Sequence, residues 1–237
     1  MHLAGDLPLV VILGPTASGK TGLGIALAQA LGGEIVSADS RQVYRQMDIG
    51  TAKPTPEQRA AVPHHLLDLV DPDEPFGLAE FLDAARPAIS AIGARGRLPL
   101  VVGGTGQYIT ALLEGWSVPQ VAPNPRLRAE LEAHAAAHGA GALYERLRAI
   151  DPESAALIHP NNVRRVVRAL EVCQTTGQRF SDLRRKVPPP YRVRQIGLTL
   201  DRERLYARAD LRFDAMMAAG FLDEVRGLLA RGYDRRL

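Results

Sequence analysis

Residues 9–21 read LVVILGPTASGKT, an aliphatic run that leads into a glycine-rich loop. The last eight letters match the pattern G-x-x-x-x-G-K-[ST], and apolar residues then recur at helical spacing through Leu23 and Leu27. A glycine-rich loop between a buried strand and the start of a helix is typical of a phosphate site, because its backbone N–H groups and the positive end of the helix dipole point at the anion. The pattern therefore predicts a phosphate-binding loop near the N-terminus.

The residue types in this loop suit that role. Gly14 and Gly19 let the backbone turn inward, Lys20 adds a mobile positive charge, and the Thr21 hydroxyl suits a Mg²⁺ ion that bridges two phosphate oxygens. The motif leaves open whether the anion is a nucleoside triphosphate or another diphosphate. The predicted phosphate-binding set is Gly14, Thr16, Ala17, Ser18, Gly19, Lys20 and Thr21.

Two further apolar runs are each followed by a candidate catalytic residue. Residues 34–38 predict a buried strand that delivers Asp39, and residues 98–102 predict another that leads into a glycine turn containing Thr105. Residues just past the carboxyl ends of parallel strands face the ligand crevice. Asp39 is therefore a candidate general base or metal-side carboxylate, although a helix N-cap is a compatible alternative. For Thr105 the alternative is a plain strand-to-helix turn.

The second half of the chain is rich in arginine. We expect Asn161 or Asn162 to cap a helix that runs to about Thr176 and stops at Gly177. On this helix Arg164 and Arg168 share a face and are spaced to contact successive phosphates. The competing interpretation is a solvated surface partly neutralised by Glu171. Further on, residues 193–200 alternate as a strand, and a helix from residue 201 carries two more arginines four residues apart, Arg208 and Arg212.

These patterns predict an α/β fold: a P-loop NTPase-like parallel sheet core with a helical insertion domain. We expect the first part of the core in residues 1–115, the insertion in residues 116–188, and the return to the core in residues 189–237.

Composition narrows the class of protein. The chain has 237 residues, 46% hydrophobic content and a net charge of +3, which suit a globular protein with a local basic surface. Cys173 is its only cysteine, which excludes an intrachain disulfide and fits a reducing cytoplasm. No apolar run approaches the roughly 20 residues of a membrane span, so we expect a cytoplasmic protein without a membrane partner. His64 and His65 lack metal-site spacing and are interpreted as polar loop or edge-strand residues.

An ordered set of stretches resembles the bacterial tRNA dimethylallyltransferases, also called tRNA isopentenyltransferases. The resemblance implies transfer of a dimethylallyl group from dimethylallyl diphosphate to N6 of the adenosine just 3′ of a tRNA anticodon. It also implies Mg²⁺ as cofactor, the tRNA anticodon loop as partner, and a monomer. The stretches that carry it are residues 14–21, 37–44, 48–54, 102–106, 158–162, 165, 168–172 and 208–225.

The resemblance also implies roles for particular residues. Asp39 would accept the N6 proton, while Thr105 and Arg212, with Lys20, would stabilise charge on the departing diphosphate. The implied tRNA-contacting residues are Asp39, Ser40, Arg41 and Gln42 at the extruded base, and Val163, Arg164, Arg165, Val166 and Val167 on the insertion.

Two features depart from the family pattern. Gln107 stands before Tyr108 where the family usually has leucine, and family members continue well past the position of Leu237. Three alternatives remain open at this point. They are prenyl transfer to free adenine nucleotides, as in the adenylate isopentenyltransferases, a small-molecule kinase in which Asp39 deprotonates a hydroxyl, and a nucleotide-switched RNA-binding module.

Overall fold

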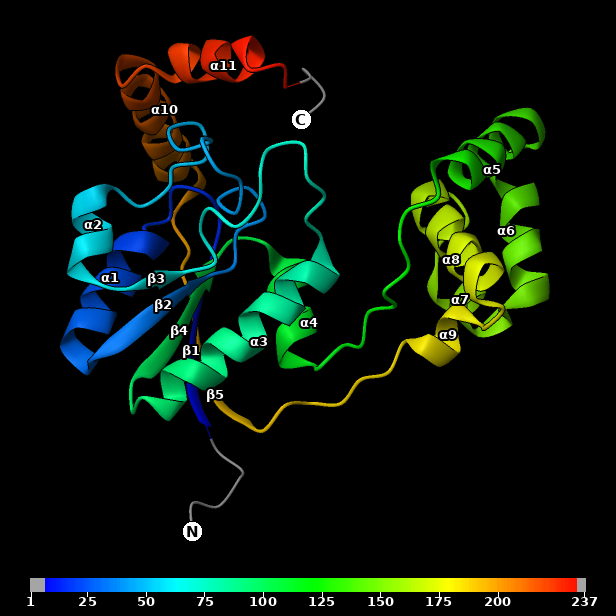
Figure 1. The fold of residues 1–237 in the computed structure, drawn as a ribbon, viewed down its shortest axis with the longest axis horizontal. Coiled ribbons are helices and arrows are strands. Elements are labelled where there is room, and N and C mark those ends of the chain that lie inside the picture. Colours follow the sequence, from blue (N-terminus) through cyan, green and yellow to red (C-terminus); the bar gives the residue numbers. More distant parts are fainter. Residues whose placement is uncertain (1–6, 234–237) are drawn as a thin grey trace. The chain divides into compact units, whose positions relative to one another are not determined.

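The computed structural model describes residues 7–233, and in this part of the chain five parallel strands form one sheet (Figure 1). Their order across the sheet is β3-β2-β4-β1-β5, which confirms the predicted parallel α/β fold. The strands are β1 (Leu7–Leu13), β2 (Gly33–Ser37), β3 (His64–His65), β4 (Leu98–Gly103) and β5 (Tyr191–Gly197).

The strand register brings the carboxyl ends of the central strands together. Leu13 at the end of β1 pairs with Gly103 of β4, and Ser37 at the end of β2 pairs with Val102. The loops that follow β1, β2 and β4 therefore begin side by side. The expected returning strand is β5, which pairs with β1 along its whole length but ends at Gly197, earlier than residue 200.

Alternation of the strand residues gives the sheet two apolar faces. Ile12, Ile35 and Val102 belong to one buried cluster that includes Ala28 of helix α1 (Lys20–Leu31). Helix α3 (Leu78–Ala94) also contacts β1, β2 and β4 and buries Phe81 and further apolar residues. The remaining helices of this part are α2 (Pro56–Ala61), α4 (Gly106–Leu113), α10 (Arg202–Ala218) and α11 (Phe221–Ala230).

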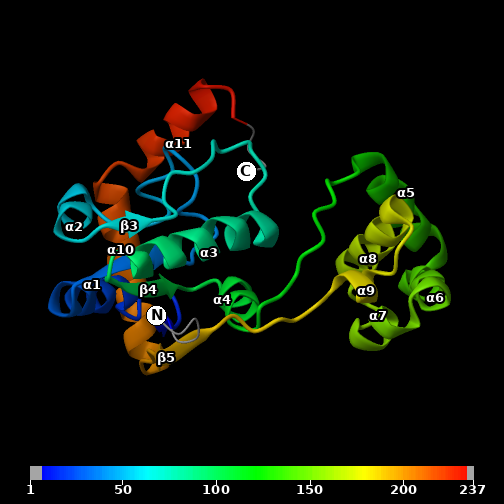
Figure 2. The same ribbon diagram turned by 60° about the horizontal axis from the view of Figure 1, so that its bottom comes forward.

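Helices α10 and α11 lie beyond the carboxyl ends of the strands, as Figures 1 and 2 show in orange and red. Gly220, with a φ of 95°, sits between the two helices in the left-handed region that favours glycine. The fold thus places both helices next to the loops that carry the candidate site. Within residues 7–233, no helix combines the length and apolarity needed to cross a bilayer.

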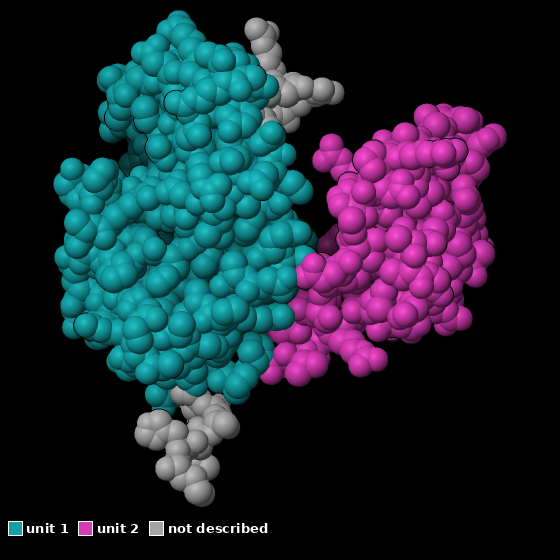
Figure 3. All heavy atoms as spheres, in the orientation of Figure 1, with its two compact units in different colours: residues 1–113, 189–237 teal, residues 114–188 magenta. Residues whose placement is uncertain are grey.

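The chain divides into two compact units, coloured separately in Figure 3. One unit comprises the residues up to Leu113 and from Pro189 onward, and the other is Glu114–Pro188. The second unit has its own core, in which Leu131, Leu147 and Leu170 are buried. Its helices are α5 (Pro125–His138), α6 (Ala140–Ile150), α7 (Pro152–Leu157), α8 (Val163–Thr176) and α9 (Phe180–Leu183).

Candidate active site

The glycine-rich loop joins β1 to α1 and has the geometry of an anion site. Gly19 precedes α1 with a φ of 97°, and no side chain caps the first turn of the helix, so its N–H groups are available to an anion. Ala17 also adopts a left-handed φ, of 64°. A Cβ at Gly14 would lie 2.6 Å from the carbonyl oxygen of Leu198, so only glycine fits there. The Ser18 hydroxyl is buried and has no partner among the described residues, which leaves it free for a bound phosphate.

Lys20 interacts with the phosphate loop, with Asp39 and with Arg212. Its Nζ donates a 2.7 Å hydrogen bond to the carbonyl oxygen of Pro15, and a Cβ on Gly104 would lie 3.7 Å from the same Nζ. Burial lowers the pKa of Lys20, the charge of Asp39 opposes that shift, and the charge of Arg212 adds to it. These interactions link the phosphate loop electrostatically to Asp39 and Arg212.

Asp39 is held in a turn just past β2. Its Oδ1 accepts hydrogen bonds from the backbone N–H groups of Arg41, at 2.8 Å, and Gln42, at 3.4 Å. The alternative role as a helix N-cap is wrong, because the next helix along the chain is α2, which begins at Pro56 and is capped by Thr55. Within the described part of the chain, Oδ2 of Asp39 has no hydrogen-bond donor and remains available to a substrate.

Thr105 joins the loops that follow β2 and β4. Its Oγ1 accepts a 3.1 Å hydrogen bond from the backbone N–H of Ser40, and its own N–H donates to the carbonyl oxygen of Ala38 at 3.2 Å. The segments at the ends of β2 and β4 approach so closely that a Cβ at Gly103 would lie 2.1 Å from that carbonyl oxygen. Thr105 thus fixes the turn that follows Asp39, and its hydroxyl group keeps a proton that it can donate.

The departure at position 107 leaves this region intact. The Gln107 side chain is exposed, whereas Tyr108 is buried and stacks on Phe81 with ring centroids 4.2 Å apart. The packing of the turn therefore depends on Tyr108 and not on its neighbour.

Helix α10 supplies the arginines that complete the anion site. A Cβ at Gly19 would lie 3.5 Å from Nη2 of Arg208, so this guanidinium reaches the phosphate loop. Arg212, one turn further along, faces a cavity of about 660 Å³. That cavity brings together several of the predicted residues, namely Thr16, Lys20, Thr21, Asp39, Arg41, Gln42 and Arg212.

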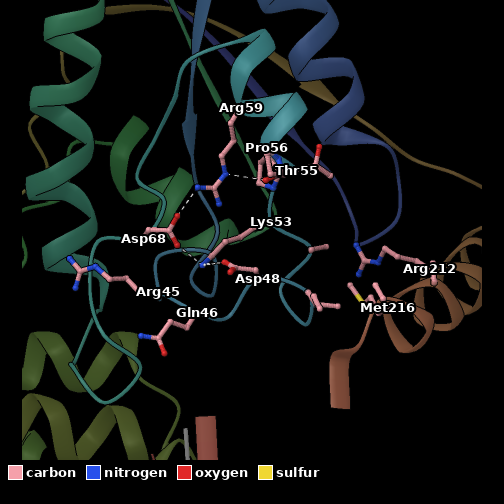
Figure 4. A pocket seen from close by; sticks show the side chains of 15 residues that line it. Arg45, Gln46, Asp48, Lys53, Thr55, Pro56, Arg59, Asp68, Arg212 and Met216 are labelled. Atoms are coloured by element: carbon pink, nitrogen blue, oxygen red, sulfur yellow. Dashed lines mark hydrogen bonds and ion pairs between the residues drawn. The ribbon is translucent and has the colours of Figure 1, made fainter. Parts of the chain in front are cut away.

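The segment 48–54 forms a neighbouring structure whose role the sequence pattern did not reveal. The Lys53 side chain is only 1% exposed, and its Nζ donates to Asp48 Oδ1 at 2.7 Å, to Asp68 Oδ1 at 2.6 Å and to the carbonyl oxygen of Tyr44. Burial alone would raise the pKa of Asp68, but hydrogen bonds from Lys53 and Arg59 lower it. The lysine therefore anchors a loop beside a second cavity of about 960 Å³, which Arg212 also lines (Figure 4).

The predicted base-contacting residues differ in what the structure leaves available. Gln42 is fully engaged, because its Oε1 accepts from Ser37 Oγ at 3.1 Å and its Nε2 donates to the carbonyl oxygens of Thr51, at 3.3 Å, and Ala52, at 3.1 Å. The Arg41 side chain is exposed and lines the smaller cavity. Arg41 is thus better placed than Gln42 to contact a base.

Helix α8 of the insertion corrects part of the predicted tRNA surface. Arg164 and Arg165 are exposed, and Val163 is partly buried against the core of its unit. Val166 and Val167 are buried in that core, because they lie on the apolar face of the helix. Their side chains therefore stabilise the unit, and a tRNA contact through them is wrong for this structure.

Arg168 and Glu171 also differ from their predicted surface roles. Glu171 is fully buried, and its carboxylate accepts hydrogen bonds from Arg168 at 2.6 Å, from Arg128 at 2.8 Å and from the backbone N–H of Asn124 at 2.7 Å. Burial alone would raise the pKa of Glu171, but these donors bring it to about 2. Arg168 further donates to the carbonyl oxygen of Val121, so it is a structural residue and no partner for Arg164 at successive phosphates.

His64, His65 and Cys173 have contacts that stabilise the fold. His64 and His65 form the edge strand β3, which confirms the polar edge-strand interpretation. His65 Nε2 lies 2.7 Å from Oε2 of Glu34 on β2, and His64 Nδ1 lies 2.7 Å from the carbonyl oxygen of Val62. Cys173 is buried, and burial raises the pKa of its thiol. Among the described residues, no cluster of three or more histidine, cysteine or acidic side chains is arranged to hold a metal ion.

The strand, glycine-rich loop and lysine-bearing helix define an α/β protein of the P-loop class, with a carboxylate next to its anion site. Residues 42–237 match the family model described as IPP transferase, and residues 7–67 match the model described as isopentenyl transferase. The chain therefore belongs to the IPP transferase family.

Individual relatives agree with this assignment. The chain is 63% identical to a protein of Roseiflexus sp. named tRNA dimethylallyltransferase, over 96% of this chain and 74% of that protein. A tRNA dimethylallyltransferase of Chloroflexus aurantiacus is 61% identical, over 95% of this chain and 76% of the relative.

Solved structures show the same likeness. The tRNA isopentenylpyrophosphate transferase of Bacillus halodurans matches with a TM-score of 0.66 and 46% identity, over 97% of this chain and 72% of that one. A eukaryotic dimethylallyltransferase described as acting on tRNA matches with a TM-score of 0.80 and 32% identity, over 95% and 56%.

Proposed function

We propose that this chain transfers a dimethylallyl group from dimethylallyl diphosphate to N6 of the adenosine 3′-adjacent to the anticodon of tRNA, with release of diphosphate. One observation supports this reaction above the others. Asp39, whose Oδ2 has no donor among the described residues, lines the same cavity as Lys20 and Arg212, so a proton acceptor and an anion site serve one pocket. The names and similarity of the relatives agree with it.

The proton acceptor belongs at the attacking nitrogen. As the N6 lone pair forms a bond to C1 of the dimethylallyl group, the C1–O bond breaks and its electron pair leaves with the diphosphate. The N6 proton passes to the Asp39 carboxylate, which the Arg41 and Gln42 N–H groups hold in orientation through Oδ1.

The anion site belongs at the leaving group. Negative charge grows on the diphosphate oxygens as the C1–O bond breaks, and preorganised donors around those oxygens lower the barrier. The donors of this chain are the first-turn N–H groups of α1, Lys20, Arg212 and Arg208. Thr105 contributes by holding Ser40, the residue next to Asp39, in place.

The donor set fits Mg²⁺ that is held mainly by its substrate. Thr21 lines the cavity and offers one hydroxyl oxygen, and no acidic cluster in the described residues adds a protein cage. Mg²⁺ commonly binds through a few protein oxygens together with phosphate oxygens and water. Thr21 would hold the ion, which would supply charge neutralisation at the diphosphate.

The second substrate must present an unstacked base. An adenosine in a single-stranded loop leaves its stack at lower cost than one in a duplex. Arg41 is exposed at the cavity, and Arg164 and Arg165 are exposed on the insertion, where they suit phosphate contacts. We assign the anticodon loop as the part of the tRNA that the protein recognises, and a monomer as the active state. We assign the cytoplasm as the compartment, since Cys173 is a free thiol.

Nucleoside mass analysis tests the reaction. The protein is incubated with Mg²⁺, dimethylallyl diphosphate, unmodified tRNA with adenosine 3′ of the anticodon, and free AMP. Prenylated adenosine in the tRNA fraction is expected. Product on AMP alone would instead assign the protein to the adenylate isopentenyltransferases, and product on neither acceptor would overturn prenyl transfer.

A further inference from the structure

The carboxylate of Glu224, on α11, binds three consecutive backbone N–H groups of the loop 48–54. Its Oε2 accepts hydrogen bonds from Asp48 and Ile49, both at 2.7 Å, and its Oε1 accepts from Gly50 at 3.0 Å. Successive N–H groups that converge in this way form a concave anion site, and hydrogen bonds to an ionised acceptor are short and strong. The bonds join segments more than 170 residues apart, so they fix α11 to this loop.

The contact forms one wall of the smaller cavity. Phe221 and Glu224 of α11 line it together with Gly50 and Thr51 of the loop. A Cβ at Gly50 would lie 2.4 Å from the Phe221 ring, so a larger residue at position 50 would displace this ring. Glu224 therefore acts at the boundary of the site and not on a remote surface.

The same loop holds Gln42, and Gln42 holds Asp39. The carbonyl oxygens of Thr51 and Ala52 accept the Gln42 amide protons, at 3.3 Å and 3.1 Å, just past the residues that bind Glu224. The backbone N–H of Gln42 then donates to Asp39 Oδ1 at 3.4 Å. A continuous series of bonds thus runs from α11 to the candidate base.

We propose that Glu224 is a positioning residue for the prenyl transfer, which keeps the loop 48–52 and Gln42 in the arrangement that orients Asp39. The inference rests on the proposed function. Without the carboxylate, three amides turn to water, the carbonyl groups that hold Gln42 shift, and Asp39 spends less time aligned with N6. The phosphate loop makes no hydrogen bond to Glu224 in the described residues, so diphosphate binding stays as it is.

Kinetics of Glu224→Ala and Glu224→Gln test the role. We expect Glu224→Ala to lower kcat by about tenfold or more, as for loss of hydrogen bonds to a charged group, with the KM for dimethylallyl diphosphate nearly unchanged. Glu224→Gln keeps one acceptor oxygen and loses less. Asp223→Asn is the matched control, since Asp223 is exposed on the same helix, bonds only Arg226 among the described residues, and should leave kcat unchanged. An unchanged kcat in Glu224→Ala, or a parallel rise in KM, would overturn the role.

A double-mutant cycle with Gln42→Ala tests the route. If the effect runs through Gln42, Glu224→Ala adds little to the loss already caused by Gln42→Ala, whereas independent losses that multiply would contradict the route.

Hydrogen exchange separates this inference from the proposed function. In Glu224→Ala the amides of residues 48–50 should exchange faster while those of β1 and β4 keep wild-type rates, which also shows that the variant is folded. Unchanged exchange at residues 48–50 would overturn the contact. A wild-type protein that forms no product would overturn the function, whereas an active wild type with unaffected Glu224 variants would overturn the positioning role alone.

Discussion

The hydroxyl oxygen of Thr105 accepts a 3.1 Å hydrogen bond from the backbone N–H of Ser40, the residue next to Asp39. This bond joins the loop after β4 to the loop after β2 across the carboxyl edge of the sheet. The side chain of Thr105 therefore contributes both an acceptor that fixes the turn and a hydroxyl proton near the pocket.

Replacement of Thr105 separates these contributions from simple packing. We expect Thr105→Ala to lower kcat/KM by about tenfold, because the Ser40 N–H loses its partner, and Thr105→Ser to retain most activity. Steady-state prenyl transfer measures both. Thr110→Ala, at an exposed position on α4, is the control. A serine variant as impaired as the alanine variant would contradict a role for the hydroxyl.

Replacement of Asp39 tests the candidate base. Removal of a general base typically costs on the order of 10²- to 10⁴-fold in rate, so Asp39→Ala should lower kcat in that range. Binding of tRNA, followed by filter retention or fluorescence anisotropy, should change little. Asp73→Ala provides an exposed acidic control. Full activity in Asp39→Ala would exclude the carboxylate as proton acceptor.

Lys53 should contribute strongly to the free energy of unfolding. Its ammonium is buried against Asp48 and Asp68, so Lys53→Met leaves Asp48 without its ion-pair partner and Asp68 with Arg59 alone. We expect a loss of about 3 kcal/mol in the free energy of unfolding, near the lower end for breaking a buried ion pair, because both partners are partly exposed. Urea denaturation measures the loss, with Lys186→Met on the exposed connector as control. Equal stabilities of the two variants would contradict the assignment.

Glu171 predicts a pH dependence of the insertion. Its pKa is about 2 in the folded state and rises to the ordinary value of 4.5 on unfolding. A lowered folded-state pKa stabilises the fold above pH 4.5, and that stabilisation, about 3 kcal/mol, is lost as pH falls from 4.5 toward 2.

The fluorescence of Trp116 reports on this unit, since it is the only tryptophan and lies within residues 114–188. Urea titrations followed at Trp116 between pH 7 and pH 3 should show the loss in the wild type. Glu171→Gln should be less stable at pH 7 and show a flatter dependence. The same slope in both proteins would assign the effect to other groups.

Sequence reasoning located the parts of the site that depend on local signals. The phosphate loop has its own motif, and Asp39 follows a strand whose carboxyl end must face the crevice, so both could be predicted from short stretches. Capping signals also placed α8 closely, since the structure has its N-cap at Asn162 and its C-cap at Gly177. The departures from the predicted roles concern side chains whose partners lie outside their own helix or strand.

Hydrophobic periodicity in the sequence does not reveal such partners. Gln42 was assigned to the base, but its amide is used by carbonyl groups nine and ten residues away. Glu171 looked like a surface residue because it is charged, yet Arg128 of another helix lets it be buried. The contact of Glu224 with residues 48–50 joins positions more than 170 residues apart in the sequence. Long-range hydrogen bonds of this kind can be seen only in the folded chain.

The exposed arginines of α8 yield a prediction for tRNA binding. Arg164 and Arg165 are exposed, so both charges are available to phosphates. Each phosphate contact releases condensed counterions, so each lost contact should lower the slope of log K against log salt by about one. We expect Arg164→Ser and Arg165→Ser to weaken tRNA binding and flatten that slope, measured by anisotropy across a salt series. Arg146→Ser, at an exposed position of α6, should change neither quantity. Equal effects of all three variants would show that tRNA senses only the net charge of the insertion and not this face of α8.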